Sequence, residues 1–283
     1  MSGRLAGYLE VLGLRDQGGT AELLTGQFHD VVLAGDVAYR FPRDEGSRRK
    51  LPAAAALLAA LDRAGLPTAV PAPLATDHLR DPLGRCYLPL TRLHGGPLAA
   101  VSGSHAEDAV ITQLAGLLDR LAQLGSHPAI RQLVPRAGPD HWLAFSGQVR
   151  EILYPLMSAL GRQRADAELA AVTSLVATGS ALVHTDLGGA NLLWTTKSGL
   201  PHLAGVLDWD GCWIGGQASD LASIAVNVGW RIAGRIGARR PATADSVLAE
   251  ARIIAATFAL QQALPAAISG DQTSLDEGLR EYR

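Results

Sequence analysis

A cluster of polar residues interrupts an apolar part of the chain. Residues 181–194 read ALVHTDLGGANLLW, so that His184, Asp186 and Asn191 lie between short runs typical of buried strands. A further run, HLAGVLDW at 202–209, follows the tight connection TTKSG and places Asp208 near its end. Functional residues often stand on loops that a rigid scaffold positions, so we predict that Asp186, Asn191 and Asp208 converge on one point.

The spacing of these residues predicts a phosphoryl-transfer site. H-x-D-x-x-x-x-N followed by an Asp after a hairpin is the pattern of a kinase catalytic loop and its metal-binding Asp. Asp186 fits the base that orients an acceptor hydroxyl, and Asn191 and Asp208 supply oxygen ligands of the kind Mg²⁺ prefers. His184 is expected to support the loop through hydrogen bonds. Any one Asp or Asn alone would equally serve as a helix cap or turn residue.

Other catalytic motifs are absent from the sequence. Neither Lys50 nor Lys197 follows a glycine, which excludes a P-loop, and no glycines have the G-x-G-x-x-G spacing. The chain also lacks H-E-x-x-H, C-x-x-C and G-x-S-x-G, which removes common metalloprotease, redox and esterase readings.

The composition predicts a globular chain of one large domain or two lobes. Its 283 residues are 48% hydrophobic, and a net charge of −2 gives no basis for binding nucleic acid or a membrane surface. Cys86 and Cys212 are expected to be buried free thiols. The N-terminus has no signal-peptide pattern and no apolar run reaches the roughly 18 residues of a membrane span, so a cytoplasmic location is expected.

The order of predicted elements indicates an α+β fold with a small β-rich N-terminal lobe and a larger, mainly helical C-terminal lobe. A hairpin is expected around Gly35-Asp36, and a helix from after Ser47 to Gly65. Further helices are expected over 104–124, 141–178 and 245–264, the first opened by Ser104 and Glu107 as a capping box and the last capped by Asp245. We predict lobes at 1–93 and 94–283, with a hinge near 91–97.

The chain resembles the aminoglycoside phosphotransferase family, whose members share a bilobal protein-kinase-like fold. The likeness lies in VHTDLGGANLLW, in GVLDWDGCWIGGQASDLA at 205–222, and in GQFHDVVL and YRFPR of the first lobe. Within the family the chain looks most like the enzymes that act on viomycin and capreomycin, as LYPLMS, FALQQAL and GLREYR suggest. The resemblance implies ATP, possibly GTP, with Mg²⁺ as cofactors, and a small cationic cyclic peptide antibiotic as substrate.

The resemblance also implies roles for individual residues. Asp186 would be the catalytic base that meets the acceptor hydroxyl, Asn191 and Asp208 the magnesium ligands, and Asp220 a structural acid bracing the catalytic loop. The nucleotide would meet residues of the first lobe and of the strands after the catalytic loop: Arg40 on the phosphates, His29 in the phosphate-facing turn GQFH, Thr91 and Leu93 at the adenine edge, and Leu193 and Leu207 on its face.

Three positions depart from the family pattern. Thr185 stands where Gly is usual, and Gly216-Gln217 where Asp-Pro is usual. The helix after the first hairpin offers Ala54 where a Glu usually pairs with the phosphate-binding cation, here Arg40. Glu45 is one candidate substitute for that acid.

The acceptor side leaves several readings open. Asp210 is expected near a cationic acceptor, and Trp213 or Trp230 would be able to stack on a guanidinium group. A second possible contact for the cationic acceptor is a C-terminal group of acids, which would otherwise form a solvated surface: Asp271, Asp276, Glu277 and Glu281. Three functions remain at this stage: a viomycin- or capreomycin-type kinase, a same-fold kinase for an aminoglycoside, macrolide or metabolite, and a nucleotide-binding pseudokinase. A monomer or weak dimer is expected.

Overall fold

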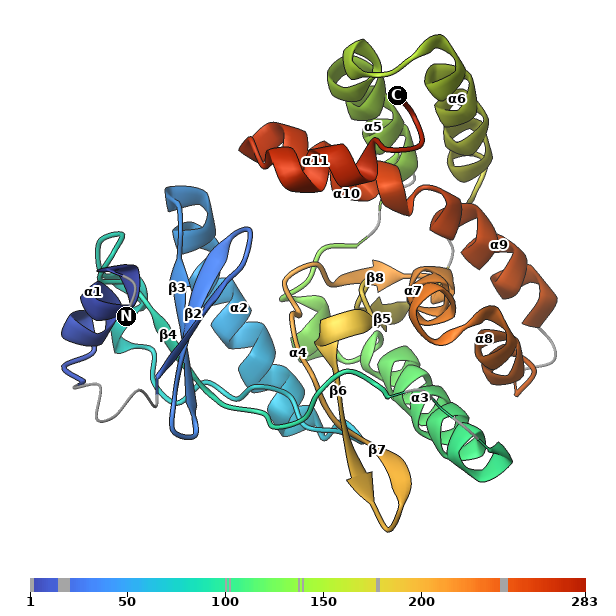
Figure 1. Ribbon diagram of the computed structural model, residues 1–283. Coiled ribbons are helices and arrows are strands. Elements are labelled where there is room, and N and C mark those ends of the chain that lie inside the picture. The colour runs from blue at the N-terminus through green and yellow to red at the C-terminus, as the bar shows by residue number, and fades with distance from the viewer. Residues whose placement is uncertain are drawn as a thin grey trace. The chain divides into compact units, whose positions relative to one another are not determined.

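The computed structural model describes residues 3–14, 21–99, 101, 103–136, 138, 140–176, 179–239 and 244–283 (Figure 1). By contacts the chain forms two compact units. Unit 1 comprises Met1–Val110, Pro128–Leu133 and Gly189–Asp210, and unit 2 comprises Ile111–His127, Val134–Gly188 and Gly211–Arg283. The lobe boundary expected near residues 91–97 stays a prediction.

Unit 1 is built on a four-stranded antiparallel sheet. Its strands, in spatial as in sequence order, are β1 (Glu22–Thr25), β2 (His29–Ala34), β3 (Val37–Pro42) and β4 (Leu88–Thr91). The predicted hairpin joins β2 to β3, and Gly35 has the positive φ of 58° that such a two-residue turn requires. Helix α1 (Gly3–Val11) packs Leu5 and Leu9 against Val32 and Phe41 of the sheet.

Helix α2 (Glu45–Ala64) follows the sheet strand β3 and contacts it (Figure 1). The predicted start after Ser47 is wrong, because Asp44 is the capping residue and its Oδ1 accepts a 2.8 Å hydrogen bond from the Ser47 N–H. The predicted end at Gly65 is confirmed, with φ of 69° at that glycine. Short helices η1 (Asp77–Arg80) and α4 (Pro128–Arg131) complete this part of unit 1.

A second hairpin in unit 1 follows the catalytic motif. The 3-10 turn η4 (Gly189–Asn191) leads into β6 (Leu192–Lys197), which pairs with β7 (Leu200–Val206). The segment after β4 is bonded to this hairpin, since the N–H groups of Gly96 and Trp194 donate to each other's carbonyls at 3.0 and 2.7 Å. Strand β6 is thereby held against Gly96.

Unit 2 is mainly helical, with one small sheet in which β5 (Ala181–Val183) pairs with β8 (Trp213–Gly215). Helix α3 (Ser104–Leu124) enters this unit from unit 1. The remaining helices are α5 (His141–Gln148), η2 (Val149–Leu153), η3 (Tyr154–Leu156), α6 (Ala159–Thr173), α7 (Ala218–Val228), α8 (Trp230–Gly237), α9 (Ala244–Ala256), α10 (Phe258–Ser269) and α11 (Gln272–Gly278).

Two predicted helices are each divided in the structure. The helix expected over 141–178 changes to a π turn and then a 3-10 turn at Pro155 before α6 begins, because proline cannot donate within a continuing α-helix. The helix expected over 245–264 breaks at Thr257, and Asp245 lies in the first turn of α9 instead of capping it. Leu153, Leu169 and Tyr282 are fully buried where these pieces pack together.

The α+β class with a small antiparallel sheet and a mainly helical remainder is as predicted. Cys86 and Cys212 are both buried free thiols, as expected. Among the described residues, no one helix has the length and apolar composition to cross a membrane, although the bent pair α9–α10 passes that test taken together.

Candidate active site

The catalytic loop of unit 2 begins where β5 ends. Asp186 is exposed, its N–H donates to His184 Nδ1 at 3.3 Å, and its Oδ1 accepts from the Ser223 hydroxyl at 3.5 Å. Asp220, on α7, accepts the N–H of His184 at 3.0 Å and that of Thr185 at 2.8 Å. The loop is therefore bonded to α7 on one side of Asp186 and carries its carboxylate toward solvent.

Asp220 is completely buried, and its environment is unusual for a carboxylate. Burial raises the pKa of Asp220, and the hydrogen bonds from the Thr185 and His184 N–H groups lower it. Burial has the larger effect, so the pKa is raised to about 7. His184 is also buried, at 1% exposure, and its backbone N–H lies 3.0 and 3.2 Å from the two carboxylate oxygens of Asp220. These two residues give the loop a rigid internal anchor.

Thr185 occupies a backbone conformation that disfavours it. Its φ is 78°, a region that is rare for non-glycine residues and strained for a β-branched one. The family's usual Gly at this position fits such a backbone without strain. The departure seen in the sequence therefore falls on a conformationally demanding position. The Thr185 side chain lies close to Gly211, since a Cβ on Gly211 would come within 3.0 Å of Thr185 Oγ1.

The two predicted metal ligands lie together in unit 1. The backbone N–H of Leu207 donates to the Asn191 carbonyl at 2.9 Å, which sets Asn191 beside the end of β7, one residue from Asp208. Asp208 has a φ of 59°, and its pKa is raised by desolvation, partly offset by the charge of Arg40. The backbones of the two residues are therefore close, and their side chains, an amide and a carboxylate, are of the hard oxygen type that Mg²⁺ takes from a protein.

Asp210 supplies the acid opposite Arg40. The guanidinium donates from Nη1 to Asp210 Oδ1 at 3.0 Å and from Nη2 to Oδ2, a bidentate arrangement. Desolvation would raise the pKa of Asp210, but the hydrogen bond and charge of Arg40 outweigh it and lower the pKa. Glu45, the substitute suggested by sequence, instead pairs with Arg48 at 2.5 Å and Arg49 at 3.5 Å in its own helix.

His29 is the third member of this group. Arg40 Nη2 lies 2.9 Å from His29 Nδ1, and because arginine only donates, Nδ1 must accept and the imidazole carries its proton on Nε2. Burial and then the charge of Arg40 lower the pKa of His29 to about 4. The group thus presents one cation held between a carboxylate and a neutral imidazole.

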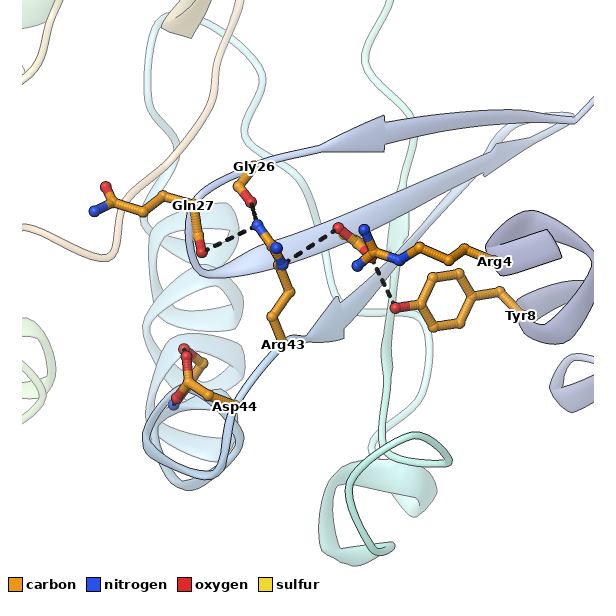
Figure 2. Close-up of polar contacts among 8 residues, drawn as sticks. Arg4, Tyr8, Gly26, Gln27, Arg43 and Asp44 are labelled. Carbon is orange, nitrogen blue, oxygen red and sulfur yellow. Dashed lines mark hydrogen bonds and ion pairs between the residues drawn. The ribbon is translucent and has the colours of Figure 1, made fainter. Parts of the chain in front are cut away.

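The turn between β1 and β2, predicted to face the phosphates, is hydrogen-bonded to Arg43 (Figure 2). Arg43 Nη1 donates to the Gly26 carbonyl at 2.6 Å, and its Nε lies 3.8 Å from the fully buried Asp30. Arg4 and Tyr8 of α1 also bond to Asp30, Tyr8 through its hydroxyl at 2.8 Å. Sequence reasoning missed this cluster, since its members come from separate parts of the chain: Asp30 lies on β2, its partners Arg4 and Tyr8 on α1, and Arg43 directly after β3.

The residues expected at the adenine lie around the hairpin β6–β7. Leu193 pairs across the hairpin with Gly205, and a Cβ on Gly205 would come within 2.6 Å of the Leu93 side chain. Thr91 is tied to Ala72 through both its N–H and its hydroxyl, at 2.9 and 2.8 Å. Leu207 follows β7 and is half-buried. Unit 1 therefore gathers these apolar residues, the metal-ligand pair and the Arg40 group.

Other sequence candidates already have partners within unit 2. Arg252 lies over the Trp230 ring at 4.3 Å, so that ring is covered by the chain's own guanidinium. Asp271 caps α11, Asp276 pairs with Arg283 at 2.6 Å, and Glu281 lies 3.5 Å from Arg164. Glu277 accepts from Gln262 at 3.3 Å. At the second departure from the family pattern, Gln217 donates to the Leu118 carbonyl at 2.6 Å.

Asp186 belongs to unit 2, whereas Asn191 and Asp208 belong to unit 1. Their convergence on one point therefore stays a prediction. What the structure gives is the local arrangement of each half: a braced loop with an exposed carboxylate in one, and a paired set of oxygen and cationic groups in the other.

Comparison with solved structures bears on the fold. An aminoglycoside 2'-phosphotransferase-IIIa in complex with GDP superposes with a TM-score of 0.80 at 20% identity, over 99% of this chain and 97% of that one. A macrolide 2'-phosphotransferase from Brachybacterium faecium gives a TM-score of 0.70 at 18% identity, over 98% and 96% of the two chains. These similarities confirm the predicted bilobal kinase-like fold class.

Comparison of sequences identifies the family. The viomycin phosphotransferase of Streptomyces vinaceus is 39% identical over 260 residues, which make up 91% of each chain. Residues 22–265 match the model of the phosphotransferase enzyme family. That match includes both the Arg40 group and the catalytic loop. The chain is a member of the phosphotransferase enzyme family.

Proposed function

We propose that this phosphotransferase uses ATP and Mg²⁺ to phosphorylate a hydroxyl of a cationic cyclic peptide antibiotic of the viomycin and capreomycin class, and so confers resistance. The observation that carries the proposal is the 39% identity to a viomycin phosphotransferase along 91% of the chain, with the motif Asp186, Asn191 and Asp208 intact. A pseudokinase would not need all three residues, so an active enzyme is the stronger reading.

In this proposal Asp186 is the catalytic base. Its exposed carboxylate accepts the hydrogen bond of the acceptor hydroxyl, orients the oxygen toward the terminal phosphate, and takes the proton as the oxygen–phosphorus bond forms. The bonds from Asp220 and His184 hold the loop in place while this occurs. Preorganisation of this kind is the main contribution a protein makes to phosphoryl transfer.

Asn191 and Asp208 would hold the magnesium ion, which when bound neutralises phosphate charge. Arg40 contributes a fixed positive charge for the phosphates, and Asp210 takes the part of the missing helix Glu by fixing the guanidinium bidentately. The expected contact of Asp210 with the acceptor remains part of the proposal. Leu93, Leu193 and Leu207 would enclose the adenine, with backbone groups near Thr91 at its edge. A cytoplasmic location and a monomer or weak dimer are expected.

A substrate panel tests the proposal. Nucleoside-diphosphate release is measured with ATP and Mg²⁺ and, in turn, viomycin, capreomycin, kanamycin and a macrolide, and then with GTP in place of ATP. We expect turnover with the two cyclic peptides at least about tenfold above that with the others, since a site shaped for one hydroxyl acceptor discriminates on that scale. Preferred turnover of kanamycin or the macrolide would replace the proposed substrate, and no turnover with any acceptor would favour a pseudokinase.

A further inference from the structure

Unit 2 contains a cavity of about 240 Å³ beside the catalytic loop. Thr185, the residue before Asp186, forms part of its wall, as does Gly211. Pockets that enclose drug-sized ligands measure roughly 300–1,000 Å³. The cavity is therefore suited to one group of a larger acceptor, held next to the loop that carries the proposed base.

The walls of this cavity are aromatic rings set at right angles. The centroids of Trp142 and Trp213 are 6.3 Å apart with an interplanar angle of 88°. The His141 ring stands 4.0 Å from Trp213 at 89°, and Phe145 stands 5.9 Å from Trp142 at 79°. These four rings, here called the cage, line the cavity together, and a ring face turned toward the cavity would attract a cation.

The cage is electrically neutral. None of the described residues that line the cavity is Lys, Arg, Asp or Glu. Burial lowers the pKa of His141, so this imidazole is neutral at neutral pH and does not repel a cation. A smaller adjoining cavity of about 50 Å³ is lined by one residue of each charge, Arg136 and Glu250, and adds no net charge. Attraction of a cation here must come mainly from the ring faces.

Trp213 also has an unused hydrogen-bond donor. Its Nε1 is shielded from solvent and has no hydrogen-bond partner among the described residues. A buried indole N–H usually finds an acceptor, and leaving one unpaired costs free energy. Because Nε1 is shielded, a ligand in the cavity would meet the ring of Trp213 and not this donor. Trp230, by contrast, is already stacked with Arg252 at 4.3 Å, which shows the same pairing of indole and guanidinium within the chain.

We propose that His141, Trp142, Phe145 and Trp213 form a cage for a guanidinium group of the peptide acceptor. The inference rests on the proposed function and extends it by assigning the group that is recognised. Guanidinium is planar, weakly hydrated and stacks on aromatic faces, which suits a neutral aromatic cavity. An acceptor rich in primary ammonium groups would instead call for carboxylates, which the described wall lacks.

Calorimetric titration of the whole protein, without nucleotide, tests the cage directly. Ethylguanidinium is compared with ethylurea, which is planar and of similar shape but uncharged, on wild type, Trp213→Leu and the matched control Trp230→Leu. We expect wild type and Trp230→Leu to bind ethylguanidinium at least about tenfold more tightly than ethylurea, and Trp213→Leu to lose this preference. Equal affinity for the two probes in wild type, or an unchanged preference in Trp213→Leu, overturns the proposal.

A second variant guards against unfolding. Trp213→Phe keeps an aromatic face and loses the N–H, so it should retain the preference for ethylguanidinium. With viomycin as acceptor, Trp213→Leu should raise the acceptor KM about tenfold while the KM for ATP and kcat stay within about twofold. If wild type phosphorylates no peptide antibiotic, the proposed function fails, whereas the contrast between guanidinium and urea still decides whether the cage exists. Two results would each contradict the cage. One is loss of the ethylguanidinium preference in Trp213→Phe, and the other is an unchanged acceptor KM in Trp213→Leu.

Discussion

At the scale of single residues, Arg40 shows how one side chain depends on another far along the chain. Its acid partner, Asp210, lies 170 positions away. Spacing patterns reveal neighbours on one helix or hairpin, so the sequence directed attention to Ala54 and Glu45 and did not reveal this pair. The spacing of Asp186, Asn191 and Asp208 is a local motif, so a site could be predicted there, and that site stays a prediction. The contacts of Asp30 and Trp142 join separate segments, so no spacing pattern marked them.

The Arg40–Asp210 pair leads to a prediction about nucleotide binding. Asp210→Asn removes the charge that fixes the guanidinium, so we expect the KM for ATP to rise about tenfold. The matched control Glu45→Gln removes a carboxylate that pairs only within α2 and should change the KM for ATP less than about twofold. Steady-state kinetics with both substrates varied measures this. A rise confined to the acceptor KM would instead assign Asp210 to the acceptor.

Thr185 leads to a prediction about stability. Thr185→Gly relieves a β-branched residue with φ of 78°, so we expect the free energy of unfolding to increase by about 1 kcal/mol. Ser198, with φ of 52° in the exposed β6–β7 turn, is not β-branched, and Ser198→Gly should give a smaller gain. Urea denaturation measures both. A less stable Thr185→Gly variant would show that the threonine side chain contributes more than its strained backbone costs.

At the scale of elements, helix-forming Ala and Leu residues predicted α2, an apolar stripe with helical spacing predicted α3, and turn residues predicted both hairpins. The boundaries were less predictable, since Asp44 and Ser47 both suit an N-cap and only the hydrogen bond of the folded chain distinguishes them. The breaks at Pro155 and Thr257 were missed because the apolar pattern continues through them. Packing of the pieces around Leu153 and Tyr282 compensates for the interrupted helix bonds.

The β1–β2 turn gives a prediction at this scale. Arg43→Ala removes the bond to the Gly26 carbonyl and the ion pair with Asp30, so we expect faster amide exchange at residues 26–28 and a KM for ATP raised about threefold to tenfold. Arg92→Ala is the control, because Arg92 bonds in the same manner to the Gly35 carbonyl, at 3.3 Å, in the next turn. Hydrogen exchange read by mass spectrometry compares the variants. Equal exchange at residues 26–28 in wild type and Arg43→Ala would contradict the role of Arg43.

At the scale of the whole molecule, the fold class was predictable because one motif is tied to a known architecture, and that architecture is confirmed by solved structures with TM-scores up to 0.80. The sequence carried less information about how the chain divides. Residues 189–210 are grouped with the N-terminal sheet in unit 1, although they follow the catalytic loop directly. Contacts such as the Gly96–Trp194 bonds, remote in sequence, decide that grouping.

The buried Asp220 leads to a prediction about the pH dependence of global stability. Its folded pKa of about 7 is above the roughly 3.9 of an unfolded aspartate, so the folded protein holds a proton that the unfolded chain releases between these pH values. This contribution is full below about pH 4 and is lost as pH rises through about 7. Relative to Asp220→Asn, wild type should lose roughly 2 to 3 kcal/mol of unfolding free energy between pH 5 and pH 8.

Urea denaturation of both proteins at the two pH values measures this difference. Asp220→Asn keeps an oxygen to accept the His184 and Thr185 N–H groups, so it is expected to fold. Parallel pH profiles for the two proteins would mean that Asp220 does not titrate in this range.

The central claim is that Asp186 directs phosphoryl transfer from ATP to a peptide antibiotic. The most direct test is mass spectrometry of viomycin after incubation with ATP, Mg²⁺ and either wild type or Asp186→Asn, with Asp166→Asn as a control for an exposed acid of unit 2 that bonds Tyr154. We expect wild type and Asp166→Asn to add one phosphoryl group at equal rates, and Asp186→Asn to do so at least about 10²-fold more slowly, with ATP affinity unchanged. Phosphorylation by Asp186→Asn at the wild-type rate, or no phosphorylated viomycin with wild type, would contradict the account.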